Sequence, residues 1–435
     1  MIDTKLSNTK EISYLSKLLQ QRNRLNLQGV SQNVATGWES LRRQGEAVVQ
    51  EMAIPTTKEE EWRFTDLSSL LEVDFQPSTV IPQDVTPHIF TETANSRLVF
   101  INGEYVPEVS SLTAIPSDIF VGNLRHTQIG EVTNYLGKQK GSEEVFTALN
   151  TASFTDGALL WIPSRREVTT PIHLLFISTA GSSPTITHPR CLVVVGTGSS
   201  LTLVEEYISI GAQNLTNSVN EMWLGANAQV NHTRVQRQGS SDYQIGKTAI
   251  AQAQDSRYTC NDITLGAKLS RHNLEIYQTG SGTETVINSL TAISETQLAD
   301  THSGIFLNHP HGTARQLHKC IVGDRARAVF NGKIFVPKPA QLTDAGQLNR
   351  NLLLSPKARV DTKPQLEITA DNVKCAHGAT VSQLEDDQIF YLQSRGLDAT
   401  NARHLLIKGF ALEIINQIPL ASVQEMLTGI VNQQY

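Results

Sequence analysis

Leu192-Val-Val-Val195, Gly196-Thr-Gly198 and Leu201-Thr-Leu-Val204 follow one another closely in the chain, and they decide the fold class. Two short runs of β-branched and apolar residues are separated by a turn of glycine and serine, a pattern typical of consecutive strands. A similar strand start follows Gly225. From about 150 to 375 the sequence has almost no helical periodicity, so we predict a long region of short strands.

An all-β region of this length indicates a sandwich, a barrel or a β-solenoid. The predicted strand starts are irregularly spaced, so the sequence shows no clean repeat. Its strands are rich in Thr, Asn, Gln and Ser, as in Asn217-Ser-Val-Asn-Glu-Met222 and Asn231-His-Thr-Arg-Val-Gln236. Polar residues stacked on an outer face, with narrow apolar residues inside, favour the solenoid over the sandwich.

Both ends of the chain show apolar residues at helical spacing, which predicts helices on either side of the β-region. The fold class is therefore mainly β, a solenoid flanked by N-terminal and C-terminal α-helical regions. We divide the chain into an N-terminal helical region (1–95), a β-core whose first part is mixed (96–375) and a C-terminal helical domain (376–435).

Composition excludes several classes of protein. The 435 residues are 39% hydrophobic, enough for a sizeable core, and the net charge of −6 argues against nucleic-acid binding by bulk electrostatics. The longest uninterrupted apolar runs, Ala158 to Ile162 and Cys191 to Val195, are far shorter than the ~20 residues of a membrane span. Four cysteines in so long a chain form no disulfide scaffold, and no signal-peptide core begins the sequence. We therefore expect a soluble protein in a reducing, cytosol-like compartment.

Common catalytic motifs are incomplete. Gly246-Lys247-Thr248 resembles the end of a phosphate-binding loop, but Ser241 stands where that loop needs glycine. Leu201 likewise breaks a dinucleotide fingerprint after Gly196-Thr-Gly198. The sequence contains no Cys-x-x-Cys, His-Glu-x-x-His or Gly-x-Ser-x-Gly. We do not expect the chain to hydrolyse ATP, to bind NAD through a fingerprint or to act as a serine hydrolase.

Two pairs of cysteine and histidine remain, Cys375-Ala-His377 and His318-Lys-Cys320. Spacing of i, i+2 on a strand puts both side chains of a pair on one face. A thiolate beside an imidazole can hold iron, zinc or sulfur, but neither pair completes a tetrahedral site, so further ligands would come from elsewhere in the fold or from a second subunit. The alternative for each pair is ordinary packing, because a buried cysteine behaves as a small hydrophobic residue.

Several longer stretches carry a resemblance to a known family. They are Lys58-Glu-Glu-Glu-Trp-Arg-Phe-Thr-Asp-Leu67, Ala326-Arg-Ala-Val-Phe-Asn-Gly-Lys-Ile334, Thr362-Lys-Pro-Gln-Leu-Glu-Ile368, Ala370-Asp-Asn-Val-Lys-Cys-Ala-His-Gly-Ala-Thr-Val381 and Phe390-Tyr-Leu-Gln-Ser-Arg-Gly396. Together they resemble the SufB/SufD family of iron–sulfur cluster assembly proteins, most strongly from 320 to 415. The short, cysteine-poor chain is more similar to the SufD branch than to the SufB branch.

This resemblance implies a right-handed parallel β-helix between helical ends. It also implies a scaffold subunit without catalytic activity, which forms a heterodimer with SufB, binds the ATPase SufC and forms a homodimer when alone. ATP hydrolysis then belongs to SufC. No stably bound cofactor is expected, only iron or an iron–sulfur cluster in transit, and the location is the cytoplasm or, for a mature organellar form, the plastid stroma. Neither a membrane nor a nucleic acid is expected as a partner.

The family also implies roles for particular residues. His377 and Cys375 correspond to the cluster-building position at the interface with SufB, with His377 the more important of the two. His318 and Cys320, which rest on their spacing and not on the resemblance, are weaker candidates for holding metal or sulfur. We expect the C-terminal helices to bind SufC through a mixed face; its residues are Phe390, Tyr391, Arg395, Arg403 and Phe410. Two alternatives stay open, an inert structural subunit without a cluster ligand and a β-helix enzyme that acts on polysaccharides.

Overall fold

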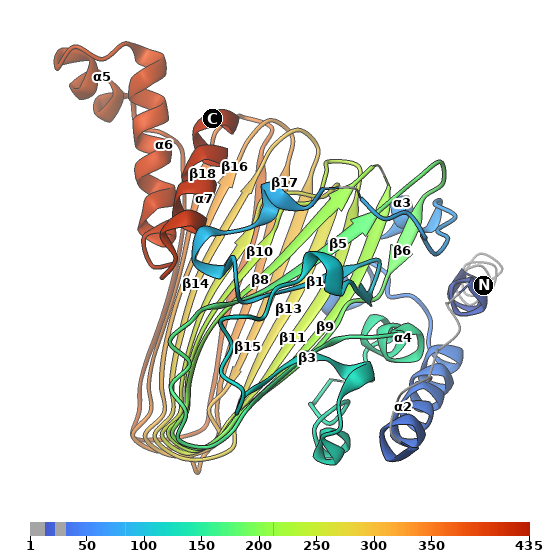
Figure 1. Cartoon of the computed structure of the whole chain (residues 1–435). Helices are drawn as coiled ribbons and strands as arrows, with labels where there is room; N and C mark the ends of the chain where they lie inside the picture. The colour runs from blue at the N-terminus through green and yellow to red at the C-terminus, as the bar shows by residue number, and fades with distance from the viewer. Residues whose placement is uncertain (1–13, 22–31, 83, 142, 212) are drawn as a thin grey trace, which may run out of the picture.

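The computed structural model describes residues 14–21, 32–82, 84–141, 143–211 and 213–435. Figure 1 shows a tall, flattened β-body, with helices of the N-terminal region beside one end and C-terminal helices at the other. The predicted mainly β fold with flanking helices is confirmed. None of the described helices is both long enough and apolar enough to cross a membrane.

The described strands form two ten-strand sheets, here sheet A and sheet B. Sheet B contains, in spatial order, β2 (Glu104–Tyr105), β1 (Arg97–Ile101), β5 (Ile172–Thr179), β8 (Ser200–Ile210), β10 (Gln229–Gln236), β12 (Arg257–Thr264), β14 (Glu284–Ile293), β16 (Thr313–Val322), β18 (Asp344–Leu353) and β20 (Lys374–Ser382). Sheet A contains β19 (Arg359–Ile368), β17 (Arg327–Val336), β15 (Leu298–Phe306), β13 (Leu269–Gln278), β11 (Tyr243–Gln252), β9 (Asn214–Leu224), β7 (Arg190–Val195), β4 (Ala158–Ile162) and β3 (Phe120–Asn123), with β6 (Thr185–Thr187) paired to β9.

From β8 onward the chain alternates between the two sheets, and each strand pairs in parallel with the strand two places later. One coil therefore consists of one strand of sheet B and the next strand of sheet A, which confirms the predicted solenoid. Strands of sheet B begin at Ser200, Gln229, Arg257, Glu284, Thr313, Asp344 and Lys374, so the repeat is 27 to 31 residues. Sequence analysis missed this repeat because its strand starts came from both sheets.

Turns between the sheets use residues that tolerate a left-handed backbone. Asn227 and Asp255, before β10 and β12, have φ of 58° and 55°, a region that Asn and Asp enter more readily than most residues. Gly266 lies in a still tighter turn, where an added Cβ would sit 2.0 Å from the carbonyl oxygen of Gln238 on the preceding coil. Stacked turns thus pack backbone against backbone at Gly266 and leave no room there for a side chain.

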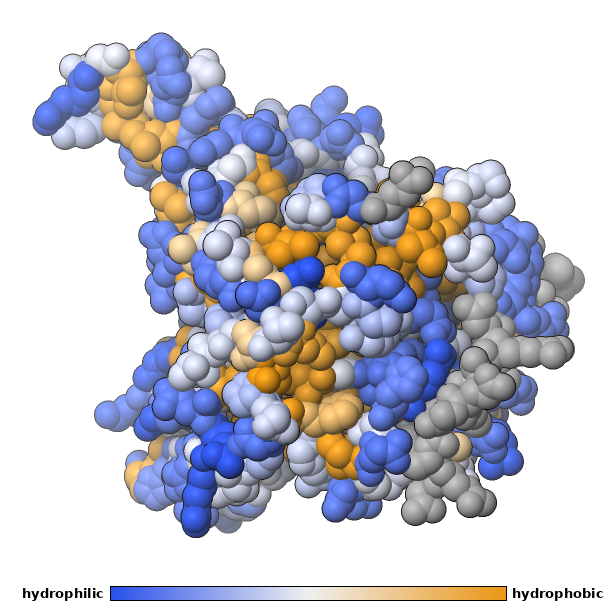
Figure 2. Space-filling model, viewed as in Figure 1, coloured by the Kyte–Doolittle hydropathy of each residue, from blue (hydrophilic) through white to orange (hydrophobic). Residues whose placement is uncertain are grey.

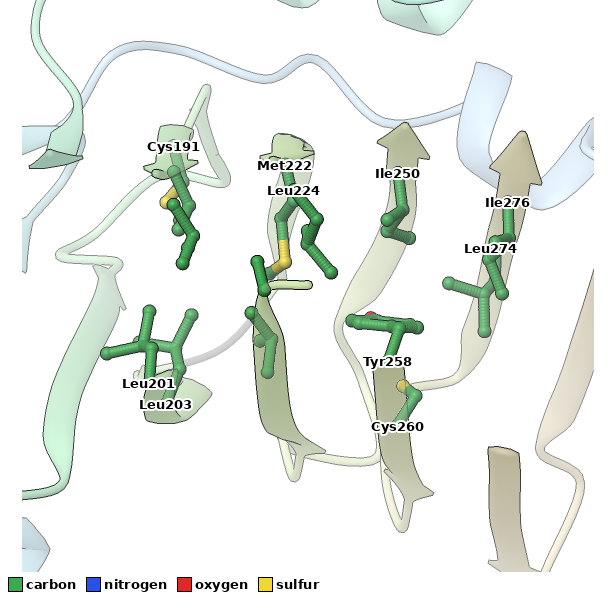
Figure 3. Packing of buried hydrophobic residues seen from close by; sticks show 14 of the residues in the cluster. Cys191, Leu201, Leu203, Met222, Leu224, Ile250, Tyr258, Cys260, Leu274 and Ile276 are labelled. Atoms are coloured by element: carbon green, nitrogen blue, oxygen red, sulfur yellow. The ribbon is translucent and has the colours of Figure 1, made fainter. Parts of the chain in front are cut away.

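The core lies between the two sheets. In Figure 3 the side chains of Met222, Leu224 and Ile250 from sheet A point toward those of Leu203 and Tyr258 from sheet B. The expected apolar residues do lie inside, but some of the polar strand residues expected on the outer face also point inward. Buried Glu205 accepts hydrogen bonds from His232 and Tyr207. Buried Asp262 pairs with Arg234 and His272. All of these side chains are on the inward faces of their strands. Such groups can be buried because they satisfy one another.

Helices cover the sides of this body. On the N-terminal side, residues 14–21 are helical, followed by α2 (Gln32–Glu51), η1 (Glu60–Trp62), α3 (Ser68–Leu71), η2 (Thr86–His88), η3 (Thr91–Thr93), η4 (Pro107–Val109), η5 (Leu124–His126), η6 (Gly130–Asn134) and α4 (Val145–Ser153). The remaining parts of the predicted N-terminal helical region, 1–13 and 22–31, lie outside the described residues. The C-terminal helices are α5 (Asp386–Ser394), α6 (Ala399–Ile415) and α7 (Ala421–Gln434).

The two ends of the solenoid differ. At the first, the short antiparallel strands β2 and β3 finish the sheets. At the other, β19 pairs with β17 and β20 pairs with β18, and no described strand pairs with their second edges. Strand β20 continues to Ser382, beyond the predicted end of the β-core at 375, because it keeps its register with β18 throughout. This exposed end carries the Cys-Ala-His sequence.

Candidate functional site at the open end of the solenoid

Cys375 and His377 lie on β20, the last strand of sheet B. Cys375 is opposite Ala345 of β18, and His377 is opposite Gln347. Cys375 is half-buried and packs against the end of the apolar core, so this residue row faces inward. By the two-residue period of a strand, His377 shares that face, and its side chain is exposed because no further coil covers it. The predicted common face of the pair is confirmed.

A groove of about 500 Å³ crosses the outer face of β14, β16, β18 and β20 and reaches His377. Small residues open it, among them Gly346, Ala376 and Gly378, and the exposed side chain of Leu348 borders it. The last coil therefore presents a polar imidazole on its inner face and an apolar surface on its outer face.

The donor set at this end is incomplete within the chain. Burial, with a smaller contribution from the charge of Asp344, raises the pKa of the Cys375 thiol, so this cysteine is a thiol at neutral pH in the isolated chain. Among the described residues, no group of three or more His, Cys, Asp or Glu side chains is placed to hold a metal ion. Two donors on an open edge can contribute to a metal or sulfur site only with ligands from another molecule.

His318 and Cys320 also share a face, as predicted, but they lie deeper. Both are buried on β16, which is separated from β20 by β18. On β18 they are opposite Asn349 and Asn351, whereas His377 is opposite Gln347. Strand spacing places them roughly 10 Å or more from the Cys375–His377 pair. Burial lowers the pKa of His318 to about 4 and raises that of Cys320 to about 12. The His318 ring stacks on Phe330, with 4.6 Å between ring centroids, as a packed core residue does.

The C-terminal helices divide into a projecting part and a seated part. Figure 1 shows α5 and the adjoining half of α6 standing away from the β-body, and Figure 2 shows apolar side chains gathered on that projection. Phe390 and Tyr391 of α5 are 70% and 57% exposed. Arg395 donates a hydrogen bond to the Tyr391 hydroxyl at 3.0 Å, and Arg403 is exposed on α6. These four predicted docking residues thus lie on the free part of the helices.

Phe410 instead belongs to the seat of α6. The buried Lys319 ammonium lies 3.8 Å from the centre of the Phe410 ring and donates hydrogen bonds to the Phe410 carbonyl and to Glu413. Arg350, the register partner of Lys319 on β18, pairs with the same carboxylate at 3.1 Å. Sequence analysis missed this anchor, since nothing in a single Lys-Cys dipeptide signals a helix that lies 91 residues later.

Comparison with known proteins agrees with this architecture. Residues 176–410 match the model of the SufBD core domain of the SUF system for FeS cluster assembly, and residues 10–174 match the SufBD protein N-terminal region. The first match contains the open end, the Cys-Ala-His sequence and most of α6.

Named relatives cover nearly the whole chain. An iron–sulfur cluster assembly SufBD family protein of Synechocystis is 49% identical over 402 residues, which are 89% of this chain and 89% of the relative. Protein ABCI7, chloroplastic, of Arabidopsis thaliana is 36% identical over 85% of this chain and 80% of its own length. Iron–sulfur cluster assembly protein SufD of Escherichia coli is 31% identical over 88% of this chain and 89% of its own length. The chain therefore belongs to the SufBD family of iron–sulfur cluster assembly proteins.

Proposed function

We propose that this protein is a non-catalytic scaffold subunit that works with SufB and the ATPase SufC in iron–sulfur cluster assembly. Its open end pairs with SufB, and His377, assisted by Cys375, takes part in iron acquisition and nascent cluster formation at that interface. The cluster is cargo that passes through the complex. The named relatives support a cytoplasmic or plastid location.

One observation carries the proposal: two side chains of types that can bind metal or sulfur stand on β20, whose outer edge pairs with no described strand, at the end of an otherwise stacked solenoid. Unpaired strand edges accept another chain. The missing donors can then come from that chain, which explains why the described residues form no complete metal site. Neutral imidazole and thiolate are suitable ligands for iron.

The direct test is a His377→Ala substitution, with the variant co-expressed with SufB and SufC. We expect the complex to assemble, because an exposed imidazole contributes little to the core, while iron and sulfide in the purified complex fall sharply. Cys375→Ser should give a milder loss. Growth that depends on this pathway should follow iron content.

His309→Ala is the matched control, since His309 lies in a turn of the solenoid and outside the proposed site. It should retain wild-type iron and sulfide. Wild-type contents in a normally assembled His377→Ala complex would contradict the ligand role and favour the inert structural subunit.

We further propose that the projecting part of α5 and α6 binds SufC. Phe390 and Tyr391 supply exposed aromatic surface, and Arg395 and Arg403 supply charge, a combination typical of the centre of protein interfaces. A double Phe390→Ala, Tyr391→Ala variant should fold normally and lose SufC in a pull-down while it retains SufB. Retention of SufC at wild-type levels would place the docking surface elsewhere.

A further inference from the structure

A short segment of the N-terminal region crosses the outer face of sheet A. This segment, Glu60–Thr65, is called the strap below. It begins in η1 and spans strands β13 to β19, and clefts of about 360 and 550 Å³ lie along it. The Trp-Arg-Phe-Thr motif of the sequence therefore has a place in the fold that the proposed function does not use.

One end of the strap is firmly seated. The Trp62 ring is buried, lies 5.8 Å from the Phe146 ring and has the Arg271 guanidinium 3.8 Å from its centre. Arg271 also donates a hydrogen bond to the Glu61 carbonyl at 2.9 Å. Buried Thr65 donates to Asp300, which is itself paired with Arg271. Apolar burial and a satisfied ion pair hold this end independently of its acidic neighbours.

The carboxylates at the other end are held by contacts near the surface, although the Glu61 carbonyl belongs to the seat. Glu60 is 74% exposed and pairs with Lys363 of β19, and Glu61 is 61% exposed with a carboxylate 3.3 Å from His302 Nδ1. Asn331 adds one hydrogen bond to Glu61 at 3.3 Å. Water can replace all of these contacts when the carboxylates move away, so this end can detach without unfolding the strap's seat.

His302 is the pivot between the two ends. Its Nε2 lies 3.0 Å from the buried Asp300 carboxylate, while its Nδ1 faces Glu61. A protonated ring has two N–H donors and can serve both carboxylates, whereas a neutral ring has one. A neutral ring protonated at Nδ1 would keep Glu61 and accept from Arg271, whose Nη1 lies 3.1 Å from Nε2, but it would leave the buried Asp300 Oδ1 without a partner. That loss costs more than returning the exposed Glu61 carboxylate to water, so the neutral ring serves Asp300 and gives up Glu61.

We propose that the strap is a proton-linked latch: the imidazolium of His302 fastens Glu61 to sheet A, and its deprotonation releases the acidic end while Trp62 stays seated. Release uncovers the face of β17 and β19 next to the open end of the solenoid. This regulation goes beyond the proposed function and does not depend on a cluster.

The charges around His302 agree with this direction. Burial alone would lower the pKa of His302, but Asp300 and Glu61 outweigh burial and raise the pKa above its ordinary value, while Arg271 opposes them. Lys363 and Glu60 face the same cleft from β19 and η1, and the other charged residues along the clefts are Lys58, Glu59, Arg63, Glu144, Glu275 and Lys333. A raised pKa means that the latch is closed at and below pH ~6.5 and opens as the pH rises through the folded-state value.

Hydrogen exchange of the strap tests this mechanism on the full chain alone. The Trp62 amide donates to the Glu59 carbonyl beside the acidic end, so its protection reports release of that end. The Thr65 amide donates to the Trp62 carbonyl in the seated part and is the internal control, whose protection should not change. After correction for intrinsic exchange, protection of the Trp62 amide in the wild type should fall by up to about tenfold per pH unit above the pKa of His302, as release of one proton requires. His302→Gln should show low protection without that pH dependence.

Two further variants keep the test decisive. Glu61→Gln removes an exposed carboxylate, should fold normally and should flatten the pH profile in the same way. His309→Gln is the matched control and should keep the wild-type profile. Wild-type protection that is independent of pH between 6 and 9, or an unchanged profile in Glu61→Gln, would overturn the latch. Iron and sulfide content is a separate measurement, so failure of the latch and failure of the cluster site can be distinguished.

Discussion

Individual cysteines in this protein differ mainly in what surrounds them. Cys191, Cys260 and Cys320 are buried, and burial raises the pKa of all three thiols, whereas Cys375 is half-exposed. Iodoacetamide should therefore label one thiol of the native chain and four in urea, and Cys375→Ser should abolish native labelling. Because the pKa of Cys375 is also raised, the labelling rate should climb steadily between pH 7 and 9. Native labelling of two or more thiols, counted by mass spectrometry, would contradict this ranking.

His318 gives a second prediction at the residue scale. Unfolded His318 takes up a proton near pH ~6.5, but the buried ring does so only near pH 4, so stability falls as the pH falls between these values. The free energy of unfolding in urea should drop from pH 7 to pH 5 by roughly 2 kcal/mol more for wild type than for His318→Gln. Exposed His404→Gln should keep the wild-type dependence, and equal drops in all three proteins would show that His318 is not the group responsible.

Sequence spacing could predict which site residues share a face, but not how deep they lie. Cys375-Ala-His377 and His318-Lys-Cys320 have the same local spacing, and both pairs lie as expected on one face of a strand. Their chemistry differs because one pair is on the last strand and the other is covered by two more strands. Burial of this kind depends on coils that come later in the chain, so local pattern carries no signal of it.

At the scale of elements, strands and terminal helices followed from hydrophobic period, whereas the coil length did not. Side chains along a strand alternate between its two faces, and this local pattern can be seen in the sequence. The repeat of 27 to 31 residues, in contrast, is visible only after the strands are assigned to sheets A and B. The seat of α6 on Lys319 and the strap over His302 also escaped prediction. Both depend on pairs of residues that are far apart in the chain.

The tight turns give a prediction for the element scale. In Gly266→Ala the new methyl group would lie 2.0 Å from the carbonyl oxygen of Gln238, so the two stacked coils would have to separate locally. We expect a loss of about 1–3 kcal/mol in the free energy of unfolding, the usual cost of overpacking. Gly130→Ala is the control, because a Cβ there meets no atom within 4 Å. Equal stability of the two variants in urea would mean that the stacked turns accommodate the methyl group without strain.

At the scale of the molecule, the solenoid is a rod with unequal ends. Helices and antiparallel strands close its first end, the seated helices α6 and α7 cover part of sheet B, and the last coil presents two strand edges with which no described strand pairs. The apolar core runs between the two sheets along the solenoid. Cys375 and His377 reach the surface because they lie on the last coil, where no further coil covers them. Under the proposed function, such a molecule needs a partner at the last coil, both to cover the edges and to complete the donor set around His377.

This need predicts a homodimer when the chain is alone, joined through the last coil. Val381 of β20 is 52% exposed at that end, and a lysine there would enter a two-fold interface twice, once from each chain. Sedimentation velocity at micromolar concentration should show a dimer for wild type and a monomer for Val381→Lys, with unchanged circular dichroism. Val80→Lys is the matched control, since Val80 is 44% exposed in a loop that precedes the first strand and should leave the dimer intact. A wild-type monomer, or a dimer that persists in Val381→Lys and dissociates in Val80→Lys, would show that the chain does not use its open edges for self-association.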